Sequence, residues 1–194
     1  MSKGRLFVLS APSGCGKSTL LSALLKRNKG WVRSVSATTR PPRAGERHGK
    51  EYWFLSRSEF QRGIARREFL EHARVLRNQY GTPRAPIEKA LRAGKDVLLG
   101  IDIQGARQIR RSTLPATTIF LLPPAFKVLR QRLEKRGTET PGQIRARLGL
   151  ARREVREAGK YEYVVVNDRL KDAVAAVEGI IQAQRHRVEK NARK

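Results

Sequence analysis

The segment from Leu6 to Arg27 constrains the fold most, because it joins a short apolar run to an amphipathic helix through a turn of small residues. Residues 6–9, with the sequence Leu-Phe-Val-Leu, have the length and unbroken hydrophobicity of a strand that is buried on both faces. Between residues 17 and 27, the leucines at positions 20, 21, 24 and 25 fall on one face of a predicted helix. A buried strand followed directly by a helix is typical of a parallel sheet whose strands are joined by helices.

The rest of the chain repeats this alternation of strand and helix. Further apolar runs of strand length occur at residues 97–103, 118–122 and 163–166. Amphipathic patterns with a helical period lie between and after them, at residues 125–136, 143–157 and 170–190. The sequence therefore predicts the α/β fold class, with a parallel sheet built from βαβ units.

Residues 36–86 interrupt that alternation. Pro and Gly are concentrated near the start of this region, and the aromatic run Tyr52-Trp53-Phe54 follows them. A Pro/Gly-rich entry followed by aromatic strand material predicts a small α+β insertion on the main sheet. At the other end of the chain, residues 185–194 are basic and we expect them to fray, with residues 191–194 as a basic tail.

The turn after the first strand has the spacing of a phosphate-binding loop. It reads Ala11-Pro12-Ser13-Gly14-Cys15-Gly16-Lys17-Ser18-Thr19 and leads into the leucine-faced helix. In such a loop the backbone N–H groups surround phosphate oxygens, Lys17 neutralises their charge and Ser18 can ligate Mg²⁺. The alternative, a glycine-rich connection without a ligand, would require the adjacent Lys and Ser to occur by chance. Cys15 has no His partner nearby in sequence, so we interpret it as a small residue at a variable position of the loop.

The charge balance indicates an anionic partner. The 194-residue chain contains 42 Lys and Arg against 17 Asp and Glu, a formal net charge of +25. Such an excess is expected of proteins that bind nucleic acids, acidic membrane surfaces or phosphorylated small molecules. The single Cys excludes a disulfide framework within the chain, and no apolar run approaches the roughly 20 residues of a membrane span. We therefore expect a cytoplasmic protein without a membrane association.

Several collinear segments together resemble the guanylate kinases, a family of nucleoside monophosphate kinases. They are the phosphate-binding loop and the segments SVSATTRPPRAGE at 34–46, EFLEHA at 68–73, NQYGT at 78–82, IDIQG at 101–105, RLEKRGTET at 132–140 and VVVND at 164–168. The resemblance implies Mg²⁺-dependent transfer of the γ-phosphate of ATP to GMP or dGMP, which gives ADP and GDP.

The same resemblance implies how the chain is divided. It places a three-layer P-loop NTPase core with a parallel sheet at residues 1–35 and 87–190. Within that core, a helical lid is expected at about residues 132–150. The insertion at residues 36–86 is expected to be a small α+β domain that binds GMP.

The resemblance also implies which residues form the site. Those expected to bind ATP are Ser13, Gly14, Cys15, Gly16, Lys17, Ser18, Thr19, Arg132, Asn167 and Asp168. Those expected to bind GMP are Ser36, Arg40, Arg43, Tyr52, Glu71, Tyr80, Gly81, Thr82 and Asp102. The expected catalytic residues, whose positive charge would stabilise the transferring phosphate, are Lys17, Arg40, Arg136 and Arg147. Ser18 and Asp102 are expected to hold the Mg²⁺ ion.

The acceptor residues have chemistry of their own, and each has a structural alternative. Arg40 and Arg43 are separated by two prolines, which hold the backbone extended so that both guanidinium groups can converge on one dianion. In a chain this rich in arginine, they could also form a solvated basic turn. Glu71 can accept hydrogen bonds from N1–H and the 2-amino group of guanine, whereas adenine offers neither. The alternative for Glu71 is a surface glutamate on a helix.

Two positions depart from the family pattern. Ala11 replaces the first glycine of the loop and adds a methyl group at its mouth. Gly100 stands where the family carries Asp or Glu, two residues before Asp102. On a strand these positions share a face, so the family directs two carboxylates at the Mg²⁺-phosphate region and this chain keeps one. We expect a raised Mg²⁺ requirement or a reduced kcat, which Gly100→Asp or Gly100→Glu should partly restore. The alternative is that another side chain fills the space at position 100, so that a carboxylate there would clash.

Two other functions compete with the enzyme. A guanylate-kinase-like binding module without catalysis would be favoured by loss of Lys17 or Ser36, and both residues are present. The positive charge is dispersed along the predicted helices and no nucleic-acid-binding motif occurs. We therefore expect only incidental, salt-sensitive association with RNA. The sequence leaves the oligomeric state open.

Overall fold

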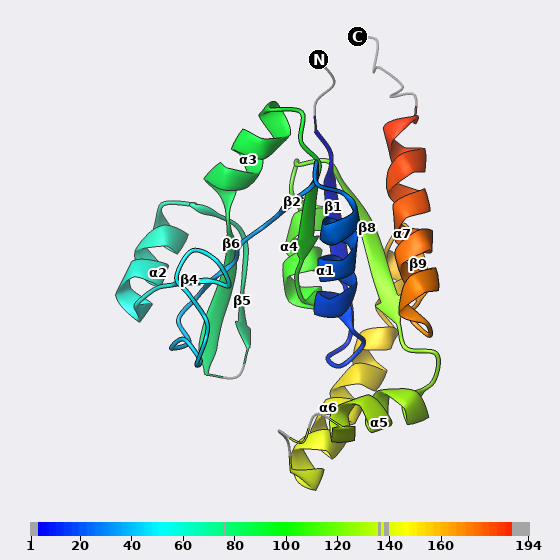
Figure 1. The fold of residues 1–194 in the computed structure, drawn as a ribbon. Helices are drawn as coiled ribbons and strands as arrows, with labels where there is room; N and C mark the ends of the chain where they lie inside the picture. Colours follow the sequence, from blue (N-terminus) through cyan, green and yellow to red (C-terminus); the bar gives the residue numbers. More distant parts are fainter. Residues whose placement is uncertain (1–3, 76, 136, 138–139, 188–194) are drawn as a thin grey trace.

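A five-stranded parallel sheet forms the centre of the computed structural model, which describes residues 4–75, 77–135, 137 and 140–187. Its strands follow the order β2-β7-β1-β8-β9 (Figure 1). Their bounds are Leu6–Ser10 for β1, Val32–Arg33 for β2, Val97–Gly100 for β7, Ala116–Leu122 for β8 and Tyr163–Val166 for β9. Every pairing in this sheet is parallel, which confirms the predicted fold class.

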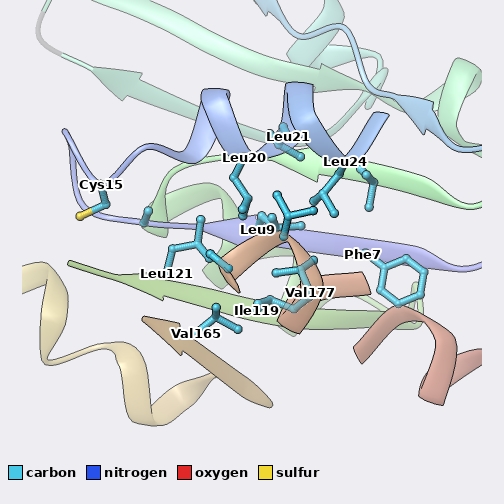
Figure 2. Packing of buried hydrophobic residues seen from close by; sticks show 14 of the residues in the cluster. Phe7, Leu9, Cys15, Leu20, Leu21, Leu24, Ile119, Leu121, Val165 and Val177 are labelled. Atoms are coloured by element: carbon cyan, nitrogen blue, oxygen red, sulfur yellow. The ribbon is translucent and has the colours of Figure 1, made fainter. Parts of the chain in front are cut away.

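Helices cover both faces of this sheet because its central strand is apolar on both sides. Phe7 and Leu9 of β1 point into one hydrophobic cluster, and Leu6 and Val8 point into the other. On the first face lie α1 (Lys17–Arg27) and α7 (Leu170–Arg185), whose side chains surround Leu9 (Figure 2). On the second face lie α3 (Arg84–Arg92) and α4 (Ile103–Arg111).

The interrupting region forms a second, smaller sheet with the order β4-β3-β6-β5. The bounds are Ala37–Thr38 for β3, Trp53–Phe54 for β4, Phe69–Val75 for β5 and Asn78–Pro83 for β6. Helix α2 (Arg57–Ala65) packs on this sheet, with the ring of Phe60 stacked on that of Phe69 at 4.6 Å. Figure 1 shows these elements on one side of the parallel sheet, connected to it through the segment that follows β2 and through α3.

Two further helices lie at the carboxyl end of the central strands. They are α5 (Phe126–Lys135) and α6 (Pro141–Val155), and Figure 1 shows them below the turn that joins β1 to α1. Helix α6 begins at a capping box in which Thr140 and Gln143 satisfy each other's backbone N–H groups. Within the described ranges, no helix has the length and apolar character needed to cross a membrane.

The structure corrects one detail of the predicted elements that matters for the site. The strand predicted at residues 97–103 ends at Gly100, because Asp102 caps the N-terminus of α4. The Asp102 Oδ1 atom accepts a hydrogen bond of 2.8 Å from the backbone N–H of Gly105. The expectation that positions 100 and 102 share a strand face is therefore wrong.

Candidate functional site

The turn between β1 and α1 has the backbone that a phosphate-binding loop requires. Gly14 and Gly16 have φ angles of 94° and 83°, a left-handed conformation that favours glycine. Helix α1 begins directly after Gly16 with no side chain capping its N-terminus, so its first N–H groups face outward. The methyl group of Ala11 is buried in the hydrophobic cluster, and the loop therefore accommodates this departure from the usual glycine.

The ammonium group of Lys17 lies at the centre of the site. Its Nζ atom donates a hydrogen bond of 2.5 Å to the carbonyl oxygen of Ile101, at the end of β7. Burial lowers the pKa of Lys17, and the carboxylates of Asp102, Glu71 and Glu154 oppose this shift. A cation partly removed from water and surrounded by acids from three different elements is a feature of functional sites.

Two hollows meet at the phosphate-binding loop. The larger, of about 870 Å³, is lined by the loop, the small sheet, the start of α4 and helix α6. The predicted site residues in its lining are Ser13, Gly14, Cys15, Gly16, Lys17, Ser18, Thr19, Ser36, Tyr52, Glu71, Tyr80, Gly81, Asp102 and Arg147. The smaller hollow, of about 320 Å³, has Gly14, Gly16, Thr19, Arg132, Asn167 and Asp168 in its lining. We call the larger hollow the acceptor compartment and the smaller hollow the donor compartment, after the ligands that the family resemblance predicts for their lining residues.

Glu71 lies on β5 in the acceptor compartment and is only 4% exposed. This position rules out the alternative of a surface glutamate on a helix. The Thr82 hydroxyl donates a hydrogen bond of 2.5 Å to Glu71 Oε1. Burial raises the pKa of Glu71 to about 7, and the nearby Asp102 acts in the same direction. Thr82 therefore holds one oxygen of the buried carboxylate. Thr82 itself is not among the residues that line the compartment.

Arg40 lies just after β3 and is held there by a residue that the sequence analysis did not single out. Its guanidinium group donates hydrogen bonds of 2.8 and 2.9 Å to the two carboxylate oxygens of Glu46. This pairing lowers the pKa of Glu46 to about 2. The Arg40 Cζ atom lies 5.4 Å from the ring centroid of Tyr52, whose ring in turn lies 6.0 Å from that of Tyr80. The only sequence feature that could have identified Glu46 is its position as an acidic residue in the same Pro/Gly-rich turn as Arg40.

Arg43 occupies a different position from Arg40. Its backbone N–H donates a hydrogen bond of 2.8 Å to Glu46, while the residue itself is exposed. Arg40 and Arg43 are therefore joined through Glu46 in this structure. Their convergence on one dianion stays a prediction.

The donor compartment is built by contacts between residues that are distant in sequence. The Asn167 amide donates a hydrogen bond of 2.7 Å to the Cys15 carbonyl oxygen, which ties the end of β9 to the loop. Arg132 donates to the carbonyl oxygens of Asn167 and Asp168 at 3.0 and 3.1 Å. Burial raises the pKa of the Cys15 thiol to about 12, which supports its interpretation as a small buried side chain.

Helix α6 approaches the same loop from the other side. Arg147 donates a hydrogen bond of 2.5 Å to the Ser13 hydroxyl. Burial raises the pKa of the Glu154 carboxyl, and the nearby Ser13 backbone N–H opposes this shift. Within the described part of the chain, the buried Oε2 atom of Glu154 has no hydrogen-bond partner. Sequence reasoning missed Glu154, although it is the one acidic residue in this arginine-rich helix. The predicted catalytic residue Arg136 lies outside the described residues.

The space at Gly100 is filled by a side chain of α1. A Cβ atom added at Gly100 would overlap Leu21 Cδ1 and lie 3.9 Å from Lys17 Cδ. Leu21 is 5% exposed and belongs to the hydrophobic cluster. The structure therefore favours the alternative in which another side chain fills this position.

This geometry defines a class of protein. A glycine-rich loop at the carboxyl end of a parallel sheet, with a partly buried lysine and a hollow on each side, is the site of a P-loop phosphotransferase. The family profile described as guanylate kinase matches residues 3–184. The chain belongs to the guanylate kinase family, and it is therefore a nucleoside monophosphate kinase, an ATP:GMP phosphotransferase.

Individual relatives agree with this assignment. A guanylate kinase of Clostridium perfringens is 47% identical over 188 residues, which cover 97% of this chain and 87% of the relative. A guanylate kinase of Thermus thermophilus is 46% identical over 185 residues, which cover 95% and 84%. The crystal structure of guanylate kinase from Anaplasma phagocytophilum matches 96% of this chain and 89% of its own, with a TM-score of 0.79 and 35% identity. The alternative of a binding module without catalysis is not favoured.

Proposed function

We propose that GMP or dGMP binds in the acceptor compartment with its base on Glu71. The observation that carries this proposal is the burial of the Glu71 carboxylate against Thr82, in the compartment that also contains the loop lysine. A carboxylate accepts from guanine N1–H and the 2-amino group, and a base without these donors would leave it buried and unpaired. We assign base contacts also to Ser36 and Asp102, which line the same compartment.

We assign the phosphate of the acceptor nucleotide to the far end of the small sheet. Arg40 and Arg43 would bind it with charge-assisted hydrogen bonds, and the hydroxyl groups of Tyr52 and Tyr80 would add donors. The bidentate pair with Glu46 supports this role for Arg40, because it holds the planar guanidinium group in one orientation before the ligand arrives.

ATP would then occupy the donor compartment, with its phosphates on the loop. The backbone N–H groups of the loop and Lys17 would bind the phosphates, and Asn167 and Asp168 would face the adenine. Arg132 would lie beside the base. Because the acceptor oxygen belongs to a phosphate that is already ionised, the transfer needs no general base. Lys17 and Arg147 would stabilise the negative charge that spreads over the transferring group, with Arg136 in the same role.

The donor set fits a Mg²⁺ ion that is bound mainly through substrate phosphates. The described residues contain no cluster of three or more His, Cys, Asp or Glu placed to hold a metal by themselves. Ser18, exposed in the first turn of α1, and Asp102 both line the acceptor compartment and offer oxygen ligands. One or two such ligands suffice for Mg²⁺ in phosphate-transfer sites, where it neutralises phosphate charge.

We also propose that two parts of the chain move during the cycle. The insertion at residues 36–86 would carry GMP toward the loop, and the lid at about residues 132–150 would bring its arginines to ATP. Closure of both would exclude water from the transferring phosphate.

A test of acceptor choice compares GMP, AMP, CMP and UMP in a coupled assay of ADP release with ATP and Mg²⁺. GMP should exceed AMP in kcat/KM by several orders of magnitude, since a wrong base leaves buried polar groups unpaired. Glu71→Gln should weaken GMP use selectively and leave the KM for ATP unchanged. Glu68→Gln, at an exposed position just before β5, is the matched control and should behave as the wild type. Equal turnover of AMP and GMP would refute the assignment of Glu71.

A further inference from the structure

Helix α4 contains a glycine that its backbone does not require. Gly105 is buried in the first turn of α4, and it is not among the glycines with a positive φ angle. At such a position alanine would form the helix more favourably. The reason for a glycine must therefore lie in what surrounds it.

The surroundings of Gly105 are the carboxyl group of Glu71. A Cβ atom added at Gly105 would overlap Glu71 Oε2 and lie 2.8 Å from Cδ and 3.3 Å from Cγ. Cβ atoms in proteins essentially never approach another heavy atom within 3.0 Å. The carboxyl group of Glu71 therefore rests in the space that the missing side chain of Gly105 leaves open.

Glu71 has little freedom to move away from this position. It is 4% exposed, and Thr82 holds its other carboxylate oxygen at 2.5 Å. Its strand β5 is paired with β6 and packs directly against α4. The Glu71 side chain therefore cannot simply rotate away from a methyl group at position 105. Such a methyl group would displace the carboxylate from its place in the acceptor compartment.

The same glycine also holds Asp102, another acid of the acceptor compartment. Its backbone N–H donates the 2.8 Å hydrogen bond to Asp102 Oδ1 that caps α4. One residue thus contacts both carboxylates, that of Asp102 through its N–H group and that of Glu71 through its bare Cα. The relative placement of Glu71 and Asp102 depends on residue 105.

We propose that Gly105 is a positioning residue for guanine recognition, whose missing side chain allows Glu71 to lie beside Asp102 in the acceptor compartment. This inference rests on the proposed role of Glu71 in binding the base. Gly105 itself has no side-chain atom that would recognise the nucleotide. Its effect on GMP is exerted through Glu71.

The test is a double-mutant cycle with Gly105→Ala and Glu71→Ala, read out by the KM values for GMP and ATP. Gly105→Ala should raise the KM for GMP about tenfold or more and leave that for ATP within about twofold. In the Glu71→Ala background the same substitution should have no further effect, since no carboxylate remains to be displaced. Gly179→Ala in α7, where an added Cβ meets nothing within 4 Å, is the matched control and should leave both values unchanged.

The outcomes separate this inference from the proposed function. If Glu71→Ala leaves GMP kinetics unchanged, the proposed role of Glu71 fails and the inference fails with it. If Glu71→Ala weakens GMP use but Gly105→Ala does not, only the inference is overturned. An equal loss from Gly105→Ala in both backgrounds would also overturn it, because the loss would then be independent of the carboxylate.

If Gly105→Ala folds poorly, thermal unfolding provides the test. The double variant should then fold and have a higher Tm than Gly105→Ala, because removal of the Glu71 side chain removes the overlap. A double variant that melts no higher than the single one would contradict the proposal.

Discussion

Replacing Glu71 by Gln should make the free protein more stable as the pH rises, relative to the wild type. The carboxylate is buried, and its pKa in the folded protein is about 7 instead of the ordinary 4.5. An acid whose pKa is raised by folding stabilises the folded state fully only below its ordinary pKa. That contribution is lost as the pH rises through the folded value, because the charged form is poorly solvated.

The size of the effect follows from the two pKa values. A difference of about 2.5 pKa units corresponds to about 3 kcal/mol of unfolding free energy at high pH, at about 1.4 kcal/mol per unit. About 2 kcal/mol of this falls between roughly pH 5.5 and pH 8. The uncharged Gln side chain does not titrate. The unfolding free energy of Glu71→Gln therefore lacks this pH-dependent contribution.

Urea unfolding of the wild type and Glu71→Gln at about pH 5.5 and pH 8 measures the difference. We expect the stability of Glu71→Gln relative to the wild type to increase by about 2 kcal/mol over this range. Glu68→Gln, which is exposed, should follow the wild type. Parallel pH profiles for the wild type and Glu71→Gln would refute the reasoning, because Glu71 would then titrate as it does in the unfolded chain.

GMP affinity provides the reciprocal measurement. In the proposed binding mode GMP requires the ionised carboxylate, so wild-type affinity should rise as the pH increases through about 7. The GMP phosphate also titrates, at about pH 6, but it does so in every variant. The pH dependence of Glu71→Gln should contain the phosphate component alone.

Three further substitutions, with Leu21→Ala as a compensating fourth, test other parts of the site. Lys17→Ala should lower kcat at least about a hundredfold in the ADP-release assay, and an unchanged kcat would remove Lys17 from the phosphate site. Glu46→Gln should raise the KM for GMP several-fold but not the KM for ATP, because Arg40 loses its bidentate partner. Tighter GMP binding would instead mean that Glu46 competes with the GMP phosphate for Arg40. Gly100→Asp should lower stability by about 1–3 kcal/mol without reducing the Mg²⁺ requirement, through overlap with Leu21. Leu21→Ala should offset part of this loss, and strictly additive effects in urea unfolding would contradict the overlap.

The elements that the sequence predicted well are those whose pattern is local. Helix α1 has the predicted bounds, Lys17–Arg27, because its leucines repeat with the helical period directly after the loop. The strands of the parallel sheet were recognisable because burial on both faces leaves unbroken apolar runs. The predicted strand at 97–103 was too long, since the apolar run continues through the turn into α4 and only the cap at Asp102 marks its end.

The site divides in the same way between local and long-range information. The spacing of the loop identified Lys17 from its immediate neighbours, and a family resemblance identified Glu71. The burial of Glu71 and its contact with Gly105 were not predictable, because they depend on how β5 docks against α4. The filling of the space at Gly100 by Leu21 likewise depends on the packing of α1 against β7.

The class of this protein follows from its sequence alone, because a phosphate-binding loop lies between a buried strand and an amphipathic helix. The charges that surround the loop, in contrast, follow from the packing of distant segments. Arg147 reaches Ser13 across 134 positions and Asn167 reaches Cys15 across 152, while Glu154 meets the loop from the same helix as Arg147. Periodicity reports which face of an element is buried, but it does not specify the partner across the interface. The packing of the helices and the two sheets sets that partner. The same packing buries Lys17 and Glu71 and therefore shifts their pKa values.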